Sequence, residues 1–179
     1  MTAVPARPTS GVEASSALAS DAMRRLLSVA RALSATDDLG QVLSVIIDAM
    51  RDLLDAERAT VFEFDAKAGE LFTTVAHGVS GGQGTPDGEL QTGIRIPITR
   101  GIAGECARHR AVINVPDAYA DPRFNREVDK RTGFTTRSIL AVPLVGVDGE
   151  LIGVAQVLNK RGGPFAHEDQ EFALALAGQ

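Results

Sequence analysis

Gln156 is the residue whose type and place most clearly indicate a binding site. It interrupts the otherwise apolar run LIGVAQVL at residues 151–158. A strand that is apolar on both parities is expected to be covered on both faces, so the amide of Gln156 loses contact with bulk water. A buried amide without hydrogen-bond partners costs about 1–3 kcal/mol, so either neighbouring backbone groups or a bound molecule must supply them.

A short run of small residues, Gly101 to Gly104 (GIAG), opens a predicted helix that extends to His109. The backbone amides of a first helical turn lack intrahelical partners and carry the positive end of the helix dipole, so they suit a phosphate group. Most glycine-containing helix starts bind nothing. This run therefore indicates an anion site only together with other residues.

The other reactive side chains favour structural roles. Cys106 is the one cysteine, which excludes an internal disulfide and a multi-cysteine metal site, and we interpret it as an inert buried thiol. His77, His109 and His167 lack the spacing of metal ligands. The sequence contains no P-loop, nucleophile elbow or kinase motif. We therefore expect neither catalysis nor a bound metal or cofactor.

Composition narrows the class of partner. The 179-residue chain has 18 Lys and Arg against 23 Asp and Glu, a net charge of -5, and no basic stripe of the kind that binds nucleic acids. It has no apolar run of membrane-spanning length and no apolar core of a secretion signal, so we expect a cytoplasmic protein that does not insert into membranes. Because the chain stops within the apolar-periodic FALALAGQ, we expect an output domain after Gln179.

Hydrophobic periodicity divides the chain into three parts. Residues 1–20 are small and polar, so we expect them to be disordered. Residues 21–36 are predicted to form a helix that mediates homodimerisation, with an ordinary packed helix as the alternative. Residues 37–179 form the main domain, which begins with a second amphipathic helix over residues 39–54 whose apolar positions follow i, i+3, i+4, i+7.

Strands dominate the middle of the chain. We expect them at residues 59–64, 70–76, 94–98, 111–115, 138–145 and 151–159. Pro97 cannot donate to a strand ladder, so the third of these strands should lie at an edge or a bulge. Asp148-Gly149 favours a tight hairpin turn between the last two. With helices at 101–109, at 127–131 and from 165 onward, the order indicates an α+β domain whose antiparallel sheet lies between helical layers.

Three motifs lie along these elements. The first is the GIAG run at 101–104, and the second is Asn114 followed by DAY at 117–119 and DPRF at 121–124. The third is TGFTTR at 132–137, which leads into Ile139-Leu140. With these motifs, the chain from about Leu39 to Ala177 resembles a GAF domain, the small-molecule-binding module of signalling proteins. The resemblance implies a GAF (PAS-like) fold with a central antiparallel sheet of about six strands.

Within that family the sequence is most similar to the cyclic-nucleotide-binding GAF domains of phosphodiesterases and certain adenylyl cyclases. That group has Asn-Lys at a strand end, then Phe, then Asp-Glu on the last helix. The matching residues here are Asn159, Lys160, Phe165 and Asp169, with Gln170 in place of the Glu. We interpret them as a structural motif in which Lys160 pairs with Asp169 and joins the strand end to the helix.

The resemblance also implies a ligand site. Thr60, His77 and Gln156 would face a purine edge, and the amides of Ile102, Ala103 and Asn125 would hold the phosphate. Asp129, Thr132 and Thr136, spaced i, i+3, i+7, would line the inner face of a helical lid. Asn125 replaces a Tyr that is frequent in the family, and Ala76 and His77 replace a Phe and an Asp of some relatives. The preference of those relatives for one base therefore cannot be assigned to this chain.

Three functions are consistent with these residues. The first is a regulatory sensor that binds cAMP or cGMP, in which the closed lid favours one helix packing and so controls an attached enzyme. The second is a GAF domain with no ligand or another ligand that serves mainly as a dimerisation module. The third is the free-methionine sulfoxide reductase branch of the family, which depends on several cysteines and so disagrees with the single Cys106. Of the three we expect the first.

Overall fold

The computed structural model describes residues 39–78 and 94–178. The segments expected to be disordered (1–20) and to form a dimerisation helix (21–36) lie outside these residues. The first described element is helix α2, Leu39–Leu53. Its apolar stripe is buried at Leu43, Ile46, Ile47 and Met50, so the predicted amphipathic helix is confirmed.

Six strands form one sheet in the order β3-β2-β1-β6-β5-β4, and every neighbouring pair is antiparallel. Their bounds are β1 Ala56–Asp65, β2 Glu70–Gly78, β3 Arg95–Pro97, β4 Ile113–Val115, β5 Ile139–Val145 and β6 Leu151–Lys160. The strand that contains Pro97 lies at the edge, as predicted from the missing proline N–H. Asp148-Gly149 lies in the turn between β5 and β6, where Gly149 has a φ of 81°.

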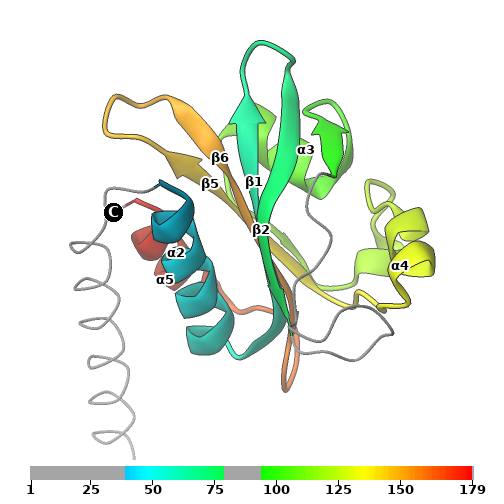
Figure 1. Ribbon diagram of the computed structural model, residues 1–179. Helices are drawn as coiled ribbons and strands as arrows, with labels where there is room; N and C mark the ends of the chain where they lie inside the picture. The colour runs from blue at the N-terminus through cyan, green and yellow to red at the C-terminus, as the bar shows by residue number, and fades with distance from the viewer. Residues whose placement is uncertain (1–38, 79–93, 179) are drawn as a thin grey trace, which may run out of the picture.

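Helices cover both faces of this sheet. Helix α2 and helix α5, His167–Ala177, lie together on one side, and helix α3, Gly101–His109, and helix α4, Arg126–Thr132, lie on the other (Figure 1). Ala59 and Val61 of β1 belong to the core beneath α2 and α5, whereas Phe62 belongs to the core beneath α3. The expected α+β architecture, an antiparallel sheet between helical layers, is therefore confirmed.

Two glycines allow backbone segments to approach one another closely. A Cβ on Gly153 in β6 would lie 2.1 Å from the carbonyl oxygen of Phe62 in β1. A Cβ on Gly104 in α3 would lie 2.7 Å from the carbonyl oxygen of Ile98. Both distances are shorter than a carbon–oxygen contact allows, so β6 packs against β1, and α3 against the chain after β3, only because these residues are glycines.

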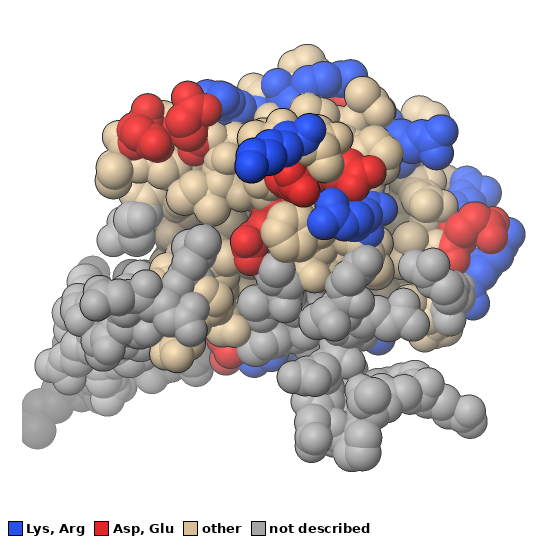
Figure 2. Space-filling model, turned by 45° about the horizontal axis from the view of Figure 1, so that its top comes forward, with Lys and Arg blue, Asp and Glu red and all other residues tan. Residues whose placement is uncertain are grey.

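The surface of the described residues carries both charges. Figure 2 shows acidic and basic side chains next to one another over the visible face, without an extended patch of either sign among the residues it colours. Arg95, for example, has its guanidinium 3.4 Å from a carboxylate oxygen of Asp65 and 3.1 Å from one of Glu70. Among the helices of residues 39–78 and 94–178, none is long and apolar enough to span a bilayer.

Candidate functional site

Two polar side chains lie side by side on the face of the sheet beneath α3. Thr60 of β1 is the register partner of Gln156 of β6, and Gln156 is also the partner of Ala141 in β5. Both polar residues are half-buried, so Gln156 is less enclosed than the apolar run predicts. Neither side chain hydrogen-bonds to another group within the described residues. This pair therefore offers a hydroxyl and an amide for hydrogen bonding on the face of the sheet beneath α3.

The start of α3 presents backbone donors. Gly101 has a φ of 72°, which glycine adopts without strain, and Arg100 before it provides no side-chain cap. Ile102 and Ala103 are both buried, at 4% exposure each. Their amides donate to no acceptor in the residues that the structure describes. Helix α3 packs on β5 and β6, so its free amides and the Thr60–Gln156 pair belong to the same face.

Asp129 of α4 is the centre of a buried hydrogen-bond cluster. One carboxylate oxygen accepts from the Thr136 hydroxyl at 2.7 Å, and the other accepts from the Thr136 amide at 2.6 Å and from the Tyr119 hydroxyl at 3.1 Å. Asp129 is 5% exposed and Thr136 is 3% exposed. The cluster holds the segment after α4 against the helix, so Asp129 and Thr136 are already engaged with each other.

The helical spacing proposed for Asp129, Thr132 and Thr136 is wrong. Helix α4 ends at Thr132 because Gly133 takes a left-handed conformation with a φ of 68°, and Thr136 lies in the irregular segment beyond it. The Thr132 hydroxyl donates to the Val128 carbonyl oxygen at 2.9 Å and is thus used within its own helix. Asp129 and Thr136 meet through the chain reversal at Gly133, and not through a shared helical face.

Asn125 and His77 are two further residues of the predicted site, and the structure describes His77 only in part. The side-chain oxygen of Asn125 accepts from the Glu127 amide at 3.1 Å and caps α4, an ordinary role for Asn before a helix. The backbone of His77 pairs with Ala59, and Ala76 pairs with Thr60. The side chain of His77 lies outside the described residues. The residue next to Thr60 on β2 is thus Ala76 and not His77.

Arg58 lies on the same face and was not singled out from the sequence. It stands two residues before Thr60 in β1, and its side chain stacks on the Phe134 ring, with the guanidinium carbon 3.7 Å from the ring centroid. Burial lowers the pKa of Arg58, although the carboxylates of Asp129 and Glu57 oppose that shift. The strand alternation could have revealed it, because Arg58, Thr60 and Phe62 share one parity.

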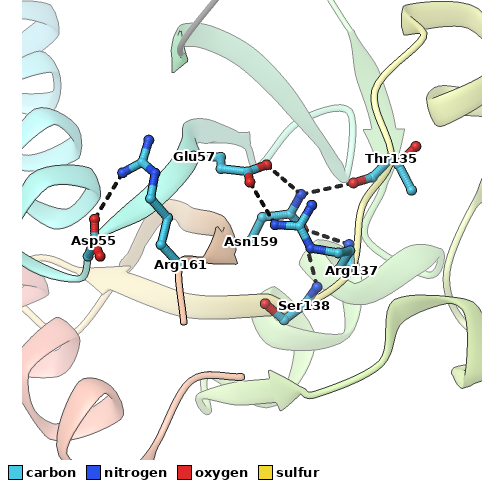
Figure 3. Close-up of polar contacts among 7 residues, drawn as sticks. All are labelled: Asp55, Glu57, Thr135, Arg137, Ser138, Asn159 and Arg161. Atoms are coloured by element: carbon cyan, nitrogen blue, oxygen red, sulfur yellow. Dashed lines mark hydrogen bonds and ion pairs between the residues drawn. The ribbon is translucent and has the colours of Figure 1, made fainter. Parts of the chain in front are cut away.

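Asn159 fixes the segment after α4 to the sheet (Figure 3). Its side-chain oxygen accepts from the amides of Arg137, at 2.6 Å, and Ser138, at 3.3 Å, while its side-chain nitrogen donates to the Thr135 carbonyl oxygen at 2.8 Å and to Glu57 at 2.9 Å. Asn159 is fully buried and has a φ of 58°. A side chain with both donors and acceptors is needed here, since the backbone groups it contacts include both kinds.

Glu57 completes this cluster. Its carboxylate contacts the Arg137 guanidinium at 2.6 Å and accepts from the Asn159 amide. Burial raises the pKa of Glu57, but the hydrogen bonds from Arg137 and Asn159 outweigh it, so the pKa lies below the ordinary 4.5. The folded state therefore favours the ionised carboxylate.

We expect this preference to make stability depend on pH. Because the folded-state pKa of Glu57 is lowered, its stabilising contribution is fully present above about pH 5 and is lost as the pH falls through the folded-state value. The difference in unfolding free energy between the wild type and Glu57→Gln should thus be constant from about pH 5 to about pH 7 and shrink below that range. Urea denaturation at a series of pH values measures this difference. A difference that does not change between about pH 3 and about pH 7 would contradict the assignment.

The other motif residues join β6 to α5. Lys160 Nζ lies 2.6 Å from Asp169 Oδ1, and the second oxygen of Asp169 accepts from the Ala166 amide at 2.7 Å. Asp169 therefore stabilises the start of α5 in place of a Ser or Thr cap. Phe165 is buried at 4% exposure, and its carbonyl oxygen accepts from the Asn114 side chain at 2.8 Å.

Cys106 has the properties of a structural thiol. It is fully buried in the core beneath α3. Burial raises the pKa of Cys106 to about 12, so the thiol stays protonated at neutral pH and is a poor nucleophile. Within residues 39–78 and 94–178, no three His, Cys, Asp or Glu side chains come together as metal ligands would.

The fold and these residues identify the family when the chain is compared with known proteins. A family model of the GAF domain matches residues 38–179. The chain belongs to the GAF family. The motifs at 101–104, 114–124 and 132–140 and the buried clusters around Asp129 and Asn159 all lie within the matched residues.

Two curated relatives of this GAF domain are named as cyclic phosphodiesterases. The probable 3',5'-cyclic phosphodiesterase pde-5 of Caenorhabditis elegans is 36% identical over 151 residues, which cover 82% of this chain and 20% of that protein. The dual 3',5'-cyclic-AMP and -GMP phosphodiesterase 11A of Takifugu rubripes is 40% identical over 114 residues, covering 63% of this chain and 11% of that protein. The chain spans only 20% and 11% of the length of these two relatives.

Solved structures agree with the GAF fold. The GAF domain of a phosphoenolpyruvate-protein phosphotransferase (ptsP) from Coxiella burnetii superposes with a TM-score of 0.70 at 22% identity, covering 87% of this chain and 88% of that one. Free methionine-R-sulfoxide reductase from Neisseria meningitidis, in complex with its substrate, gives 0.69 at 19% identity, covering 99% and 92%. At such low identity these similarities show the fold alone.

Proposed function

We propose that this GAF domain is a regulatory sensor that binds a cyclic nucleotide, cAMP or cGMP, between the sheet and the helices α3 and α4. The observation that carries the proposal is the pair Thr60 and Gln156, whose side chains have no hydrogen-bond partner within the described residues. Half-buried polar groups without partners favour a ligand that provides them. The similarity to cyclic phosphodiesterases supports a cyclic nucleotide as that ligand.

The two ends of such a ligand match two features of the site. The hydroxyl of Thr60 and the amide of Gln156 suit the edge of a purine base, because each group both donates and accepts. The amides of Ile102 and Ala103 at the start of α3 suit the cyclic phosphate. The segment from Asp129 to Thr136 closes over the bound molecule, and its hydrogen-bond cluster keeps it ordered.

Regulation follows if the ligand changes the packing of the helices. A ligand that binds the closed arrangement more tightly than the open one shifts the population toward the closed arrangement. Since the chain spans a fifth or less of the two curated relatives, we infer that it is one module of a larger protein. The helix predicted at residues 21–36 would join two copies, and an output domain after Gln179 would receive the signal.

Isothermal titration calorimetry of the 179-residue chain with cAMP and with cGMP tests the proposal. Saturable heat with at least one nucleotide, together with a rise in melting temperature that grows with nucleotide concentration, is the expected result. The absence of both heat and thermal shift with either nucleotide would refute it and leave the dimerisation module as the remaining function.

Thr60→Val is expected to weaken nucleotide binding about fivefold, because it removes one hydrogen bond worth about 1 kcal/mol while keeping the shape of the side chain. The matched control is Thr99→Val, which makes the same change at an exposed side chain outside the residues assigned to the site. Calorimetry should find the control unchanged. Equal affinities for Thr60→Val and the wild type would remove Thr60 from the site.

A further inference from the structure

The guanidinium of Arg58 is a buried cation whose N–H donors meet no acceptor among the residues that the structure describes. Arg58 is 9% exposed, yet its side chain hydrogen-bonds to no group within residues 39–78 and 94–178, and its Nε is fully enclosed without a partner there. An arginine has five N–H donors in a rigid fork, and a buried one is normally paired. The carboxylates of Asp129 and Glu57 favour its charged form but are hydrogen-bonded within clusters of their own.

The residues around Arg58 hold its guanidinium in place but do not accept its hydrogen bonds. Phe134, in the segment that follows α4, covers one face of its plane at 3.7 Å. Stacking on an aromatic ring leaves the edge of a guanidinium free to donate. Arg58 is two residues from Thr60 along β1, and so its side chain leaves the sheet on the same face as the Thr60–Gln156 pair. Three polar side chains, those of Arg58, Thr60 and Gln156, thus lie along one face without a hydrogen-bond partner in the described part of the chain.

Because the fork has donors and no acceptor, it discriminates between bases. The Hoogsteen edge of guanine presents two acceptors, O6 and N7, to which arginine donates two parallel hydrogen bonds. The same edge of adenine presents N7 beside the N6 amino group, and an amino group that faces a guanidinium brings two donors together. Thr60 and Gln156 do not discriminate in this way, since each both donates and accepts.

We propose that Arg58 is a specificity-determining residue that donates to the acceptor edge of a guanine base, so that the domain binds cGMP in preference to cAMP. This inference rests on the proposed nucleotide site and adds the choice of base. Arg58 is preorganised by Phe134, and therefore its hydrogen bonds to the base form without further ordering of the side chain.

The test compares the affinities of cGMP and cAMP by calorimetry for the wild-type chain and three variants. For the wild type we expect cGMP to bind roughly tenfold to a hundredfold more tightly than cAMP. Arg58→Met keeps the length and removes the donors, so it should bring the two affinities to within about threefold, mainly by weakening cGMP. Arg58→Lys keeps the charge without the fork and should lose most of the preference.

Arg126→Met is the matched control. Arg126 also lies over an aromatic ring, with its guanidinium carbon 5.2 Å from the Tyr119 centroid, but it is exposed. This variant should keep the wild-type ratio of affinities. Circular dichroism and thermal melting verify that each variant is folded, and if Arg58→Met is not, then Arg58→Lys decides.

The outcomes separate this inference from the proposed function. A wild type that binds both nucleotides equally, or prefers cAMP, overturns the role of Arg58 and leaves the nucleotide site standing. A folded Arg58 variant that retains the full preference for cGMP does the same. A wild type that binds neither nucleotide overturns both.

Discussion

Asn159→Ala is expected to lower the free energy of unfolding by about 3–5 kcal/mol, the range typical of breaking a buried polar network. The substitution removes four side-chain hydrogen bonds and leaves the amides of Arg137 and Ser138 and the carbonyl of Thr135 without partners. Alanine also adopts a φ of 58° less readily than asparagine, whose short polar side chain tolerates the left-handed region. Urea denaturation, monitored by circular dichroism, measures the change.

Asn159→Gly separates the two causes. Glycine adopts the positive φ without strain, so this variant should be about 1 kcal/mol more stable than Asn159→Ala while still lacking the four hydrogen bonds. If the free energy of unfolding of Asn159→Ala lies within about 1 kcal/mol of the wild-type value, then other contacts hold the segment from Thr135 to Ser138.

Asp129→Ala is expected to destabilise the domain by about 2–4 kcal/mol, because hydrogen bonds to a charged group contribute more than those between neutral groups. The variant leaves the buried hydroxyl and amide of Thr136 without an acceptor. It also removes a carboxylate that compensates the buried charge of Arg58. Unfolding measurements give the stability, and amide hydrogen exchange should show faster exchange at Thr136.

Asp129→Asn should have a smaller effect of about 1 kcal/mol. The Thr136 hydroxyl can turn to accept from the new amide, while the remaining oxygen keeps the Thr136 N–H and the Tyr119 hydroxyl. Asp117→Ala is the control, since this exposed Asp only caps a short 3-10 helix, Ala118–Ala120, and its loss should destabilise by about 1 kcal/mol. If Asp129→Ala lowers the free energy of unfolding no more than Asp117→Ala does, the Asp129 cluster has no central role in stability.

The regular elements could be predicted because their signals are local. The i, i+3, i+4 stripe of residues 39–54 corresponds to α2, and the apolar runs on both sides of Asp148-Gly149 correspond to β5 and β6. Pro97 correctly placed its strand at the edge of the sheet. In each case a period or a single special residue determines the structure without reference to distant parts of the chain.

The arrangement of the candidate site depended on distant contacts and was predicted less well. The helix expected at 127–131 corresponds to α4, but the i, i+3, i+7 spacing assumed for Asp129 to Thr136 does not hold, because Gly133 takes a left-handed conformation and reverses the chain. Asn159 was recognised only as part of a motif, because three of its four hydrogen bonds are to backbone groups more than 20 residues away, which have no sequence signature. Arg58 was overlooked since an isolated arginine in a strand usually faces solvent.

The adjacency of Asn159 and Lys160 has a mechanical consequence. Asn159 anchors the chain that returns from α4 on one side of the sheet, and Lys160 anchors the start of α5 on the other. Because one peptide bond joins the two anchoring residues, a displacement of one of them moves the other directly. The two layers are coupled through the end of β6 by the shortest covalent route that a polypeptide allows.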